Sequence, residues 1–166
     1  MAQVNNLKES PDKAEIATDA RTLVQEAFKA TLATLDSATG CPYASLITVA
    51  TDTTGAPIFL ISNLARHTRN LVDDPRASIL FDGTGDLADP LQGARVTLHG
   101  RAETASGEAV KQRFLKAHPE ASLYVDFEDF VFWRLVVEGA HFIGGFGRIV
   151  DLEPADFLDT SGGAEA

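Results

Sequence analysis

Residues 61–81 have the sequence ISNLARHTRNLVDDPRASILF, and this stretch changes from strand to helix and back. Apolar residues at both of its ends predict strands. Between them, Ser62 and Asn63 are residue types that cap helix starts. The spacing predicts a helix over 64–72, and Pro75 lies just beyond its end. A helix placed between strands in this way, without regular strand–helix alternation, favours an antiparallel sheet with added helices.

The predicted helix carries basic side chains at its start. Arg66, His67 and Arg69 follow the capping residues, in a chain whose net charge is −10. The free N–H groups of a helix start, together with two arginines on one face, make an anion site suited to a phosphate monoester. The alternative is a solvated helix face whose arginines pair with carboxylates such as Asp73 and Asp74, and the spacing alone favours this alternative.

Alternating and β-branched segments predict the rest of the sheet. The expected strands lie at 31–35, 42–51, 57–61, 77–81, 94–103, 130–137 and 141–146, and 149–152 extends the last one. The first three are expected to form an antiparallel meander. Further helices are expected after Ser10-Pro11-Asp12 and from Ser106 to residue 117. About seven strands and three helices predict a mainly β, α+β fold, an antiparallel barrel with helical additions.

Length and composition limit the organisation and the partners. A single domain of residues 10–158 is expected between a flexible N-terminus (1–9) and a disordered tail (159–166). The acidic balance argues against nucleic acid or an anionic membrane surface as partner. The single cysteine, Cys41, excludes an intrachain disulfide. Without a signal peptide or an apolar run of about 20 residues, a cytoplasmic location is expected.

The histidines are scattered along the chain, at positions 67, 99, 118 and 141. No pair has the i,i+4 spacing of a zinc site, and no Cys-x-x-Cys motif is present, so no metal site is predicted. No nucleophile signature is present either. One histidine is enough to ligate haem, which leaves His99 and His141, both on predicted strands, as candidate ligands.

Six segments in a fixed order carry a family resemblance. They are ATLATLD (30–36), PYASLITVATD (42–52), PIFLISNLARHTRNL (57–71), DPRASILF (74–81), ARVTLHGRA (94–102) and AHFIGGFGR (140–148). Together they resemble the FMN-binding split-barrel family, the pyridoxamine 5′-phosphate oxidase-like superfamily, and within it the HugZ-type branch of haem utilisation. The resemblance covers about residues 14–158 and implies an antiparallel split β-barrel of the FMN-binding type.

The resemblance also implies a homodimer with flavin sites at the subunit interface. Ser45, Leu46 and Ile47 match the strand beside the flavin ring and the ribityl chain. Ile61 and Ser62 match a pair that contacts the cofactor near its phosphate.

Further residues match the phosphate clamp and the wall of the flavin pocket. Arg66 and His67 match the basic pair of the clamp, with Arg69 beside them. The family often has lysine at the second position of this pair. Histidine there would make the affinity for phosphate more dependent on pH. Arg95 matches a strand start that faces the flavin from the other subunit, where relatives often have glutamine. Trp133 and Arg134 match a late strand that lines the pocket.

These matches predict an FMN-dependent oxidoreductase that acts on a small-molecule substrate. One alternative is a haem-binding or haem-utilisation protein of the same fold, and another is a flavin-binding protein without turnover. The arginine/histidine substrate motif of true pyridoxamine phosphate oxidases has no counterpart in residues 147–166, which argues against vitamin B6 synthesis. Haem-degrading relatives have a histidine ligand near the C-terminus, and no histidine follows His141, which argues against haem degradation.

Overall fold

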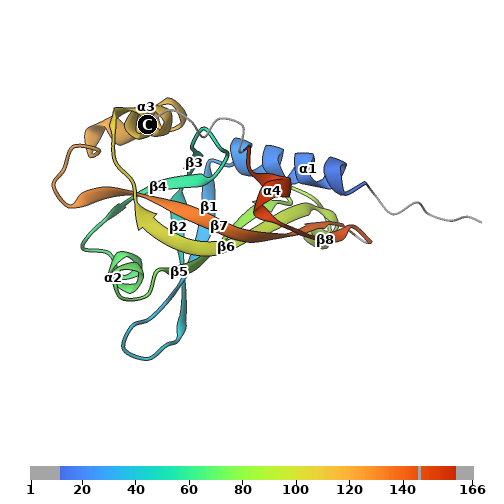
Figure 1. The fold of residues 1–166 in the computed structure, drawn as a ribbon, viewed down its shortest axis with the longest axis horizontal. Coiled ribbons are helices and arrows are strands. Elements are labelled where there is room, and N and C mark those ends of the chain that lie inside the picture. Colours follow the sequence, from blue (N-terminus) through green and yellow to red (C-terminus); the bar gives the residue numbers. More distant parts are fainter. Residues whose placement is uncertain (1–11, 146, 160–166) are drawn as a thin grey trace, which may run out of the picture.

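The computed structural model describes residues 12–145 and 147–159 (Figure 1). The strands are β1 (Lys29–Leu35), β2 (Pro42–Thr48), β3 (Ala50–Thr51), β4 (Pro57–Ser62), β5 (Arg76–Gly83), β6 (Ala94–Thr104), β7 (Phe130–Gly144) and β8 (Ile149–Leu152). The helices are α1 (Lys13–Glu26), α2 (Arg66–Asp73), α3 (Glu108–Ala117) and α4 (Pro154–Phe157), with short 3₁₀ turns η1 (Pro90–Gln92) and η2 (Pro119–Leu123). The predicted flexible N-terminus and the predicted tail lie outside the described residues, except for Asp159.

All strands belong to one antiparallel sheet with the order β2-β1-β5-β6-β7-β4-β3, and β8 pairs with β7. The sheet curls, so that the strands have an inner and an outer face (Figure 1). On β5 the inner residues Ala77, Ile79 and Phe81 are buried, while the alternate residues Arg76 and Leu80 are exposed. This alternation is the period-2 pattern that predicted the strands.

Two hydrophobic cores hold the sheet in shape. The larger core fills the inner face and is closed by the apolar side of α1, which contributes Ile16, Ala20 and Val24. The smaller core lies on the other side of β4, where Ile58 and Leu60 pack in one cluster with residues of α3 and η2. Strand β4 is therefore buried on both faces, whereas the outer face of β1, β2, β5 and β6 carries none of the described helices (Figure 1).

The predicted strand 42–51 is wrong in one respect, because it breaks at Val49. The segment before the break pairs with β1, and the segment after it pairs with β4. The predicted meander therefore divides into two hairpins that lie at opposite edges of the sheet. The Val49 backbone is still satisfied, since its N–H donates to Phe28 O (3.2 Å) and its carbonyl accepts from His118 Nε2 (2.7 Å).

The two predicted strands 130–137 and 141–146 form the single strand β7. The register against β6 runs from Gly100 opposite Val137 to His99 opposite Gly139, which leaves Glu138 as the extra residue of a β-bulge. Glu138-Gly139, which has the composition of a turn, thus belongs to this bulge. At Gly100 a Cβ would overlap the carbonyl oxygen of Val136, so that only glycine fits.

The predicted helix starts differ from the observed ones by one to a few residues. Asp12 caps α1, where its carboxylate accepts from Ala14 N (3.1 Å), and Ser10 and Pro11 lie outside the described residues. Gly107, and not Ser106, precedes α3, and no side chain caps it.

We expect Gly100→Ala to lower the free energy of unfolding by about 1–3 kcal/mol, because the added methyl group clashes with backbone held in the β6–β7 ladder. Thr97→Ala, on the outer face of the same strand, is the control and should stay within about 0.5 kcal/mol. Urea denaturation measures both changes. Equal stability of Gly100→Ala and wild type would contradict the close approach at the bulge.

Candidate functional site

The predicted anion site lies at the start of α2, but the helix begins later than predicted. Its first residue is Arg66, and Ala65 occupies the cap position without a side-chain hydrogen bond. Ser62 stabilises the preceding turn, where its hydroxyl accepts from Leu64 N (3.1 Å) and donates to Asp129 Oδ2 (2.7 Å). The prediction that Ser62 and Asn63 cap the helix is therefore wrong by about one turn.

Arg66 is held by a carboxylate that the sequence spacing did not indicate. Its Nε and Nη2 donate to Asp36 Oδ2 at 3.2 and 2.6 Å, and its guanidinium lies 4.9 Å from the centre of the Tyr43 ring. The Arg66 hydrogen bond, with a smaller contribution from Thr39, lowers the pKa of Asp36 to about 2. The ion-paired helix face thus exists, with Asp36 in place of Asp73 and Asp74. Arg66 remains exposed on its other side.

His67 points back toward β2. Its Nδ1 lies 3.0 Å from Ser45 Oγ, while its Nε2 is buried without a hydrogen-bond partner among the described residues. Burial lowers the pKa of His67, which favours the neutral ring. The Arg69 side chain folds back onto the segment between β4 and α2, where its Nη1 donates to Leu64 O (2.9 Å). The structure thus places the Ser45 and His67 side chains in contact.

The remaining predicted residues lie in separate places. Leu46 is exposed on the outer face of β2, whereas Ile47 and Ile61 belong to the main core. Trp133 is buried in the same core, and its indole Nε1 has no partner among the described residues. Arg134, the next residue, lies on the opposite face of β7.

The side chains of Arg95 and Arg134 both form hydrogen bonds with residues on β6 or just before it. Arg134 pairs with Glu103, whose Oε1 accepts from its Nε at 2.6 Å. Arg95 donates to Leu91 O (2.8 Å) and Gly93 O (3.2 Å). Within this chain Arg95, Trp133 and Arg134 do not join the cluster around His67.

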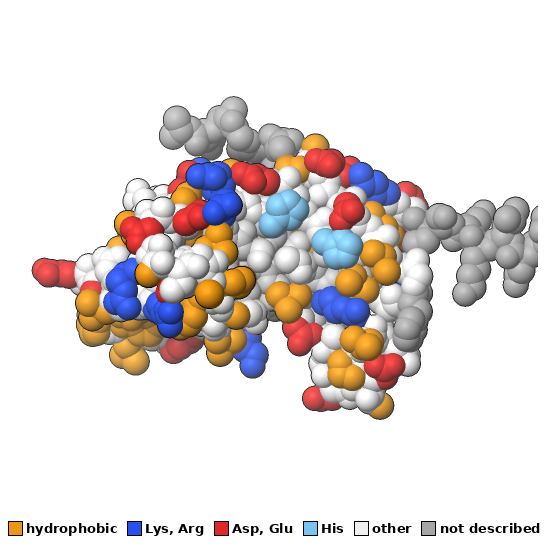
Figure 2. Space-filling model, turned by 90° about the horizontal axis from the view of Figure 1, so that it is seen from below, with side chains coloured by type: hydrophobic (Ala, Val, Ile, Leu, Met, Phe, Trp, Pro, Cys, Tyr) orange, Lys and Arg blue, Asp and Glu red, His pale blue; other side chains and the backbone are white. Residues whose placement is uncertain are grey.

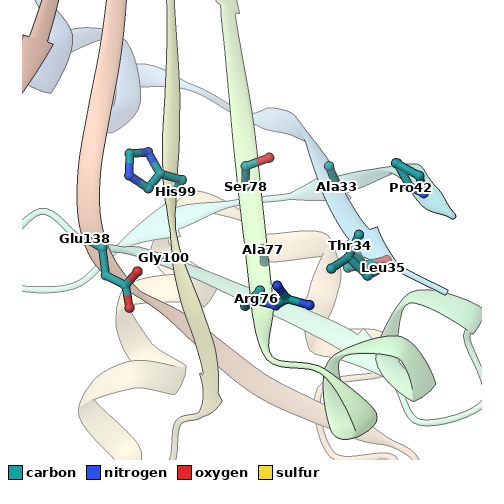
Figure 3. Close-up of a pocket in the computed structure, with 10 residues that line it drawn as sticks. All are labelled: Ala33, Thr34, Leu35, Pro42, Arg76, Ala77, Ser78, His99, Gly100 and Glu138. Carbon is teal, nitrogen blue, oxygen red and sulfur yellow. The ribbon is translucent and has the colours of Figure 1, made fainter. Parts of the chain in front are cut away.

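A pocket of about 430 Å³ opens on the outer face of the sheet, across β1, β5, β6 and the bulge of β7 (Figure 3). Its lining consists of Ala33, Thr34, Leu35, Pro42, Arg76, Ala77, Ser78, His99, Gly100 and Glu138. Only His99 of these was singled out from the sequence. The others were missed because short polar and apolar residues on separate strands give no motif, and only the sheet register brings them together.

His99 has an unusual position in this pocket. Its ring lies over the neighbouring strand, where an ideal Cβ on Gly139 would come within 2.6 Å of Cε1 and 2.8 Å of Nε2. Neither ring nitrogen has a hydrogen-bond partner in the described part of the chain. Figure 3 shows the ring and the Glu138 carboxylate on the same side of the sheet. Glycine at position 139 therefore gives space to an imidazole that is free to bind another molecule.

One basic side chain, Arg76, lines the pocket, and a second lies beside it on β6 outside the lining. Arg76 is opposite Arg101 in the β5–β6 register, and both are exposed. Arg76 also pairs with Asp74 (Nε to Oδ1, 3.0 Å), which lowers the pKa of Asp74 to about 2. A guanidinium has five N–H donors, so this ion pair leaves donors for a further anion.

A second exposed histidine lies further along the same face. His141 is opposite Thr97, two residues from His99 in the β6–β7 register, and its Nδ1 contacts Asp151 Oδ1 at 2.6 Å. Figure 2 shows two histidine side chains close together on one face, surrounded by basic, acidic and apolar groups. Within residues 12–145 and 147–159 no three His, Cys, Asp or Glu side chains are grouped to hold a metal ion.

Comparisons with known proteins find several chains similar to this one. The chain is 37% identical over 111 residues to the chloroplastic non-canonical heme oxygenase HOZ of Arabidopsis thaliana, covering 64% of this chain and 33% of that protein. It is 39% identical to a heme binding protein from Mycobacterium smegmatis, with a TM-score of 0.79 over 89% of this chain and 60% of that chain. The chain thus spans about a third and about three fifths of these relatives.

The fold itself extends to more distant proteins. A putative pyridoxamine 5′-phosphate oxidase from Listeria innocua superposes with a TM-score of 0.61 at 15% identity, over 78% of this chain and 99% of that chain. The predicted antiparallel split barrel is thereby confirmed. No helix of the described residues is long and apolar enough to cross a membrane. The cytoplasmic location stays a prediction, since one relative is named as chloroplastic.

The family follows from a model match over nearly the whole described chain. The family described as "CREG, beta-barrel" matches residues 11–159. The predicted likeness to pyridoxamine 5′-phosphate oxidase-like proteins is confirmed for the fold, and the relatives above include a heme oxygenase and a heme binding protein. The chain belongs to the CREG β-barrel family.

Proposed function

We propose that this chain binds haem in the pocket on the outer face of its sheet. The observation that carries the proposal is the unpartnered imidazole of His99, which lies over Gly139 inside that pocket. A free imidazole is the commonest protein ligand of haem iron, and one suffices. His141 is the weaker candidate because it does not line the pocket, although its contact with Asp151 through Nδ1 would leave Nε2 for the iron.

The pocket suits the other parts of haem as well. Ala33, Leu35 and Pro42 give it an apolar wall, and its volume of about 430 Å³ is in the range of cofactor sites. Arg76 and Arg101 are placed to bind the two carboxylates of the porphyrin, since arginine is suited to bidentate carboxylate contacts.

A second copy of the chain would complete this site. The outer face that carries the pocket also exposes Leu46 (68%), Leu80 (39%) and Val136 (42%), which are large apolar side chains without a cover in the single chain. Such an exposed face marks an interaction surface, and a homodimer would bury it and enclose the haem.

Two relatives support haem as the ligand, since one is named a heme oxygenase and the other a heme binding protein. Bound haem would supply iron-centred redox chemistry. The residues of this chain would ligate the iron through His99, orient the ring against β1 and hold its carboxylates. Glu138, which is exposed beside His99 in the bulge, is the titratable group available to move a proton there.

We expect the full chain to give a shifted Soret band with micromolar haem, and His99→Ala to weaken binding at least about tenfold because the iron loses its ligand. Gly139→Val should weaken binding with His99 still present, since the added side chain displaces the ring. His141→Ala is the matched control and should bind as wild type does. Unchanged affinity in His99→Ala would rule out this ligand, and transfer of the loss to His141→Ala would identify the other histidine.

A flavin is the second candidate, and the buried Nε2 of His67 is the observation that favours it. This ring lies beside Ser45 at the start of α2, where Arg66 is exposed and backbone N–H groups are free of side-chain caps. We propose that these groups would hold the 5′-phosphate of FMN, with Leu46 beside the ring and Arg95 or Trp133–Arg134 of a second copy on its other side. The activity would then be oxidation or reduction of a small molecule by the flavin, or flavin binding without turnover.

For the flavin, we expect the Arg66→Ala/His67→Ala double variant to lose FMN affinity at least about tenfold relative to wild type, since each side chain would contact a phosphate with a charge of about −1.5 to −2. The double variant should keep riboflavin binding, because riboflavin lacks the phosphate. Flavin fluorescence quenching measures both. Equal loss for FMN and riboflavin would mean that the two residues do not bind the phosphate.

The buried ring of His67 also predicts a pH dependence of stability. Burial lowers its folded-state pKa below the ordinary 6.5, so the unfolded chain takes up the proton first as the pH falls. This contribution is complete above pH 6.5 and is lost as the pH falls from there toward the lowered pKa. Urea denaturation at about pH 7.5 and about pH 5.5 should show a smaller loss of stability in His67→Gln than in wild type or the exposed-site control His99→Gln. An identical loss in all three proteins would show that the His67 ring is not desolvated.

A further inference from the structure

A second pocket, of about 310 Å³, lies between the C-terminal ends of α1 and α3 and the short strand β3. Its lining consists of Gln25, Ala27, Val49, Ala50, Thr51, Arg113, Lys116 and Ala117. None of these residues lines the outer-face pocket or belongs to the cluster around His67. The pocket is therefore independent of both proposed cofactor sites.

The rim of this pocket is cationic in an acidic chain. Arg113 and Lys116 are three residues apart on α3 and so project from the same face of the helix. No Asp or Glu lines the pocket, although the net charge of the chain is −10. The lining adds two neutral side-chain donors, the Gln25 amide and the Thr51 hydroxyl.

The two cations keep donors free. Arg113 Nε donates to Thr51 O (3.0 Å) and its Nη2 to Asp52 O (3.2 Å), which fixes the guanidinium against β3. Its remaining N–H groups, on Nη1 in particular, have no partner in the described chain, and neither does Lys116. Asp52, the neighbouring acid, uses its carboxylate in its own turn, where Oδ1 accepts from Thr54 N (2.8 Å) and Ala56 N (3.1 Å).

The floor of the pocket is apolar. Val49 and Ala50 are buried, and Ala27 and Ala117 complete a surface of small aliphatic groups. The Val49 N–H and carbonyl are both taken, by Phe28 O and His118 Nε2. A polar ligand would therefore find donors only at the rim, while an apolar chain would bury surface against the floor.

We infer that this pocket binds a small organic carboxylate with a short apolar chain. The carboxylate would lie between Arg113 and Lys116, and the aliphatic chain would lie on Val49 and Ala50. The alternative is that the two cations only offset the negative end of the α3 dipole, as basic side chains at a helix C-terminus often do. That alternative predicts binding governed by charge, without a contribution from the floor.

Three probes separate these explanations: hexanoate, which has both features, hexanol, which has only the chain, and inorganic phosphate, which has only the charge. Titrations of the ¹⁵N-labelled full chain would follow the amide signals of Ala50, Thr51 and Ala117. We expect saturable shifts with hexanoate and an affinity for each other probe lower by at least about threefold. Phosphate binding equal to hexanoate, hexanol binding equal to hexanoate, or no shift at these amides would each overturn the inference.

Variants test the same site independently. Arg113→Gln and Lys116→Gln should each weaken hexanoate binding at least about threefold, since each removes one cation from the carboxylate. Lys13→Gln, which removes an exposed cation near the start of α1, is the control and should leave the affinity unchanged. Equal affinity in all three variants would overturn the assignment of the carboxylate to the α3 rim.

Discussion

The backbone of Val49 is the constraint on which the rest of the fold depends. The chain leaves one edge of the sheet here and enters the other, so the Val49 N–H and carbonyl cannot join a ladder and need other partners. The carbonyl only accepts, so His118 Nε2 is the donor, and the His118 ring is fully buried between Phe28 and Phe114 at 4.6 and 4.7 Å. This junction separates the β1–β2 hairpin from the β3–β4 hairpin, so the two hairpins lie at opposite edges of the one sheet.

The two faces of the sheet have different roles. The inner face and β4 are covered by helices, which places both cores there. The outer face keeps exposed side chains in register, so His99, Arg76 and Glu138, from three neighbouring strands, line one pocket. The β-bulge adds the last element, because it brings Gly139 under the His99 ring and turns Glu138 toward the same side. An uncovered half-site of this kind fits a protein that binds its ligand between two copies.

Sequence patterns predicted most of the strands, and the places where they failed have physical reasons. Alternation identifies β5 and β6, since each has one buried face, but it continues through Val49 because buried residues lie on both sides of the break. Glu138-Gly139 has turn composition, yet a bulge needs the same residues. The family resemblance assigned Ser45 and His67 to different parts of one cofactor site, which stays a prediction; in the structure the two side chains lie 3.0 Å apart. Asp36 was missed as the partner of Arg66 because only the curl of the sheet joins them.

The two cofactor hypotheses differ in whether the side chains that would bind the cofactor already have partners. A phosphate at α2 must share Arg66 with Asp36, whose pKa of about 2 keeps it charged near neutral pH, and it meets a His67 ring whose pKa is lowered by burial. Like charges near one guanidinium weaken each other's binding. Haem at the outer face would use an imidazole that has no partner to give up, but its carboxylates would share Arg76 with Asp74, as a phosphate would share Arg66 with Asp36. The unpartnered imidazole, and not the arginines, is therefore what distinguishes the haem hypothesis from the flavin hypothesis.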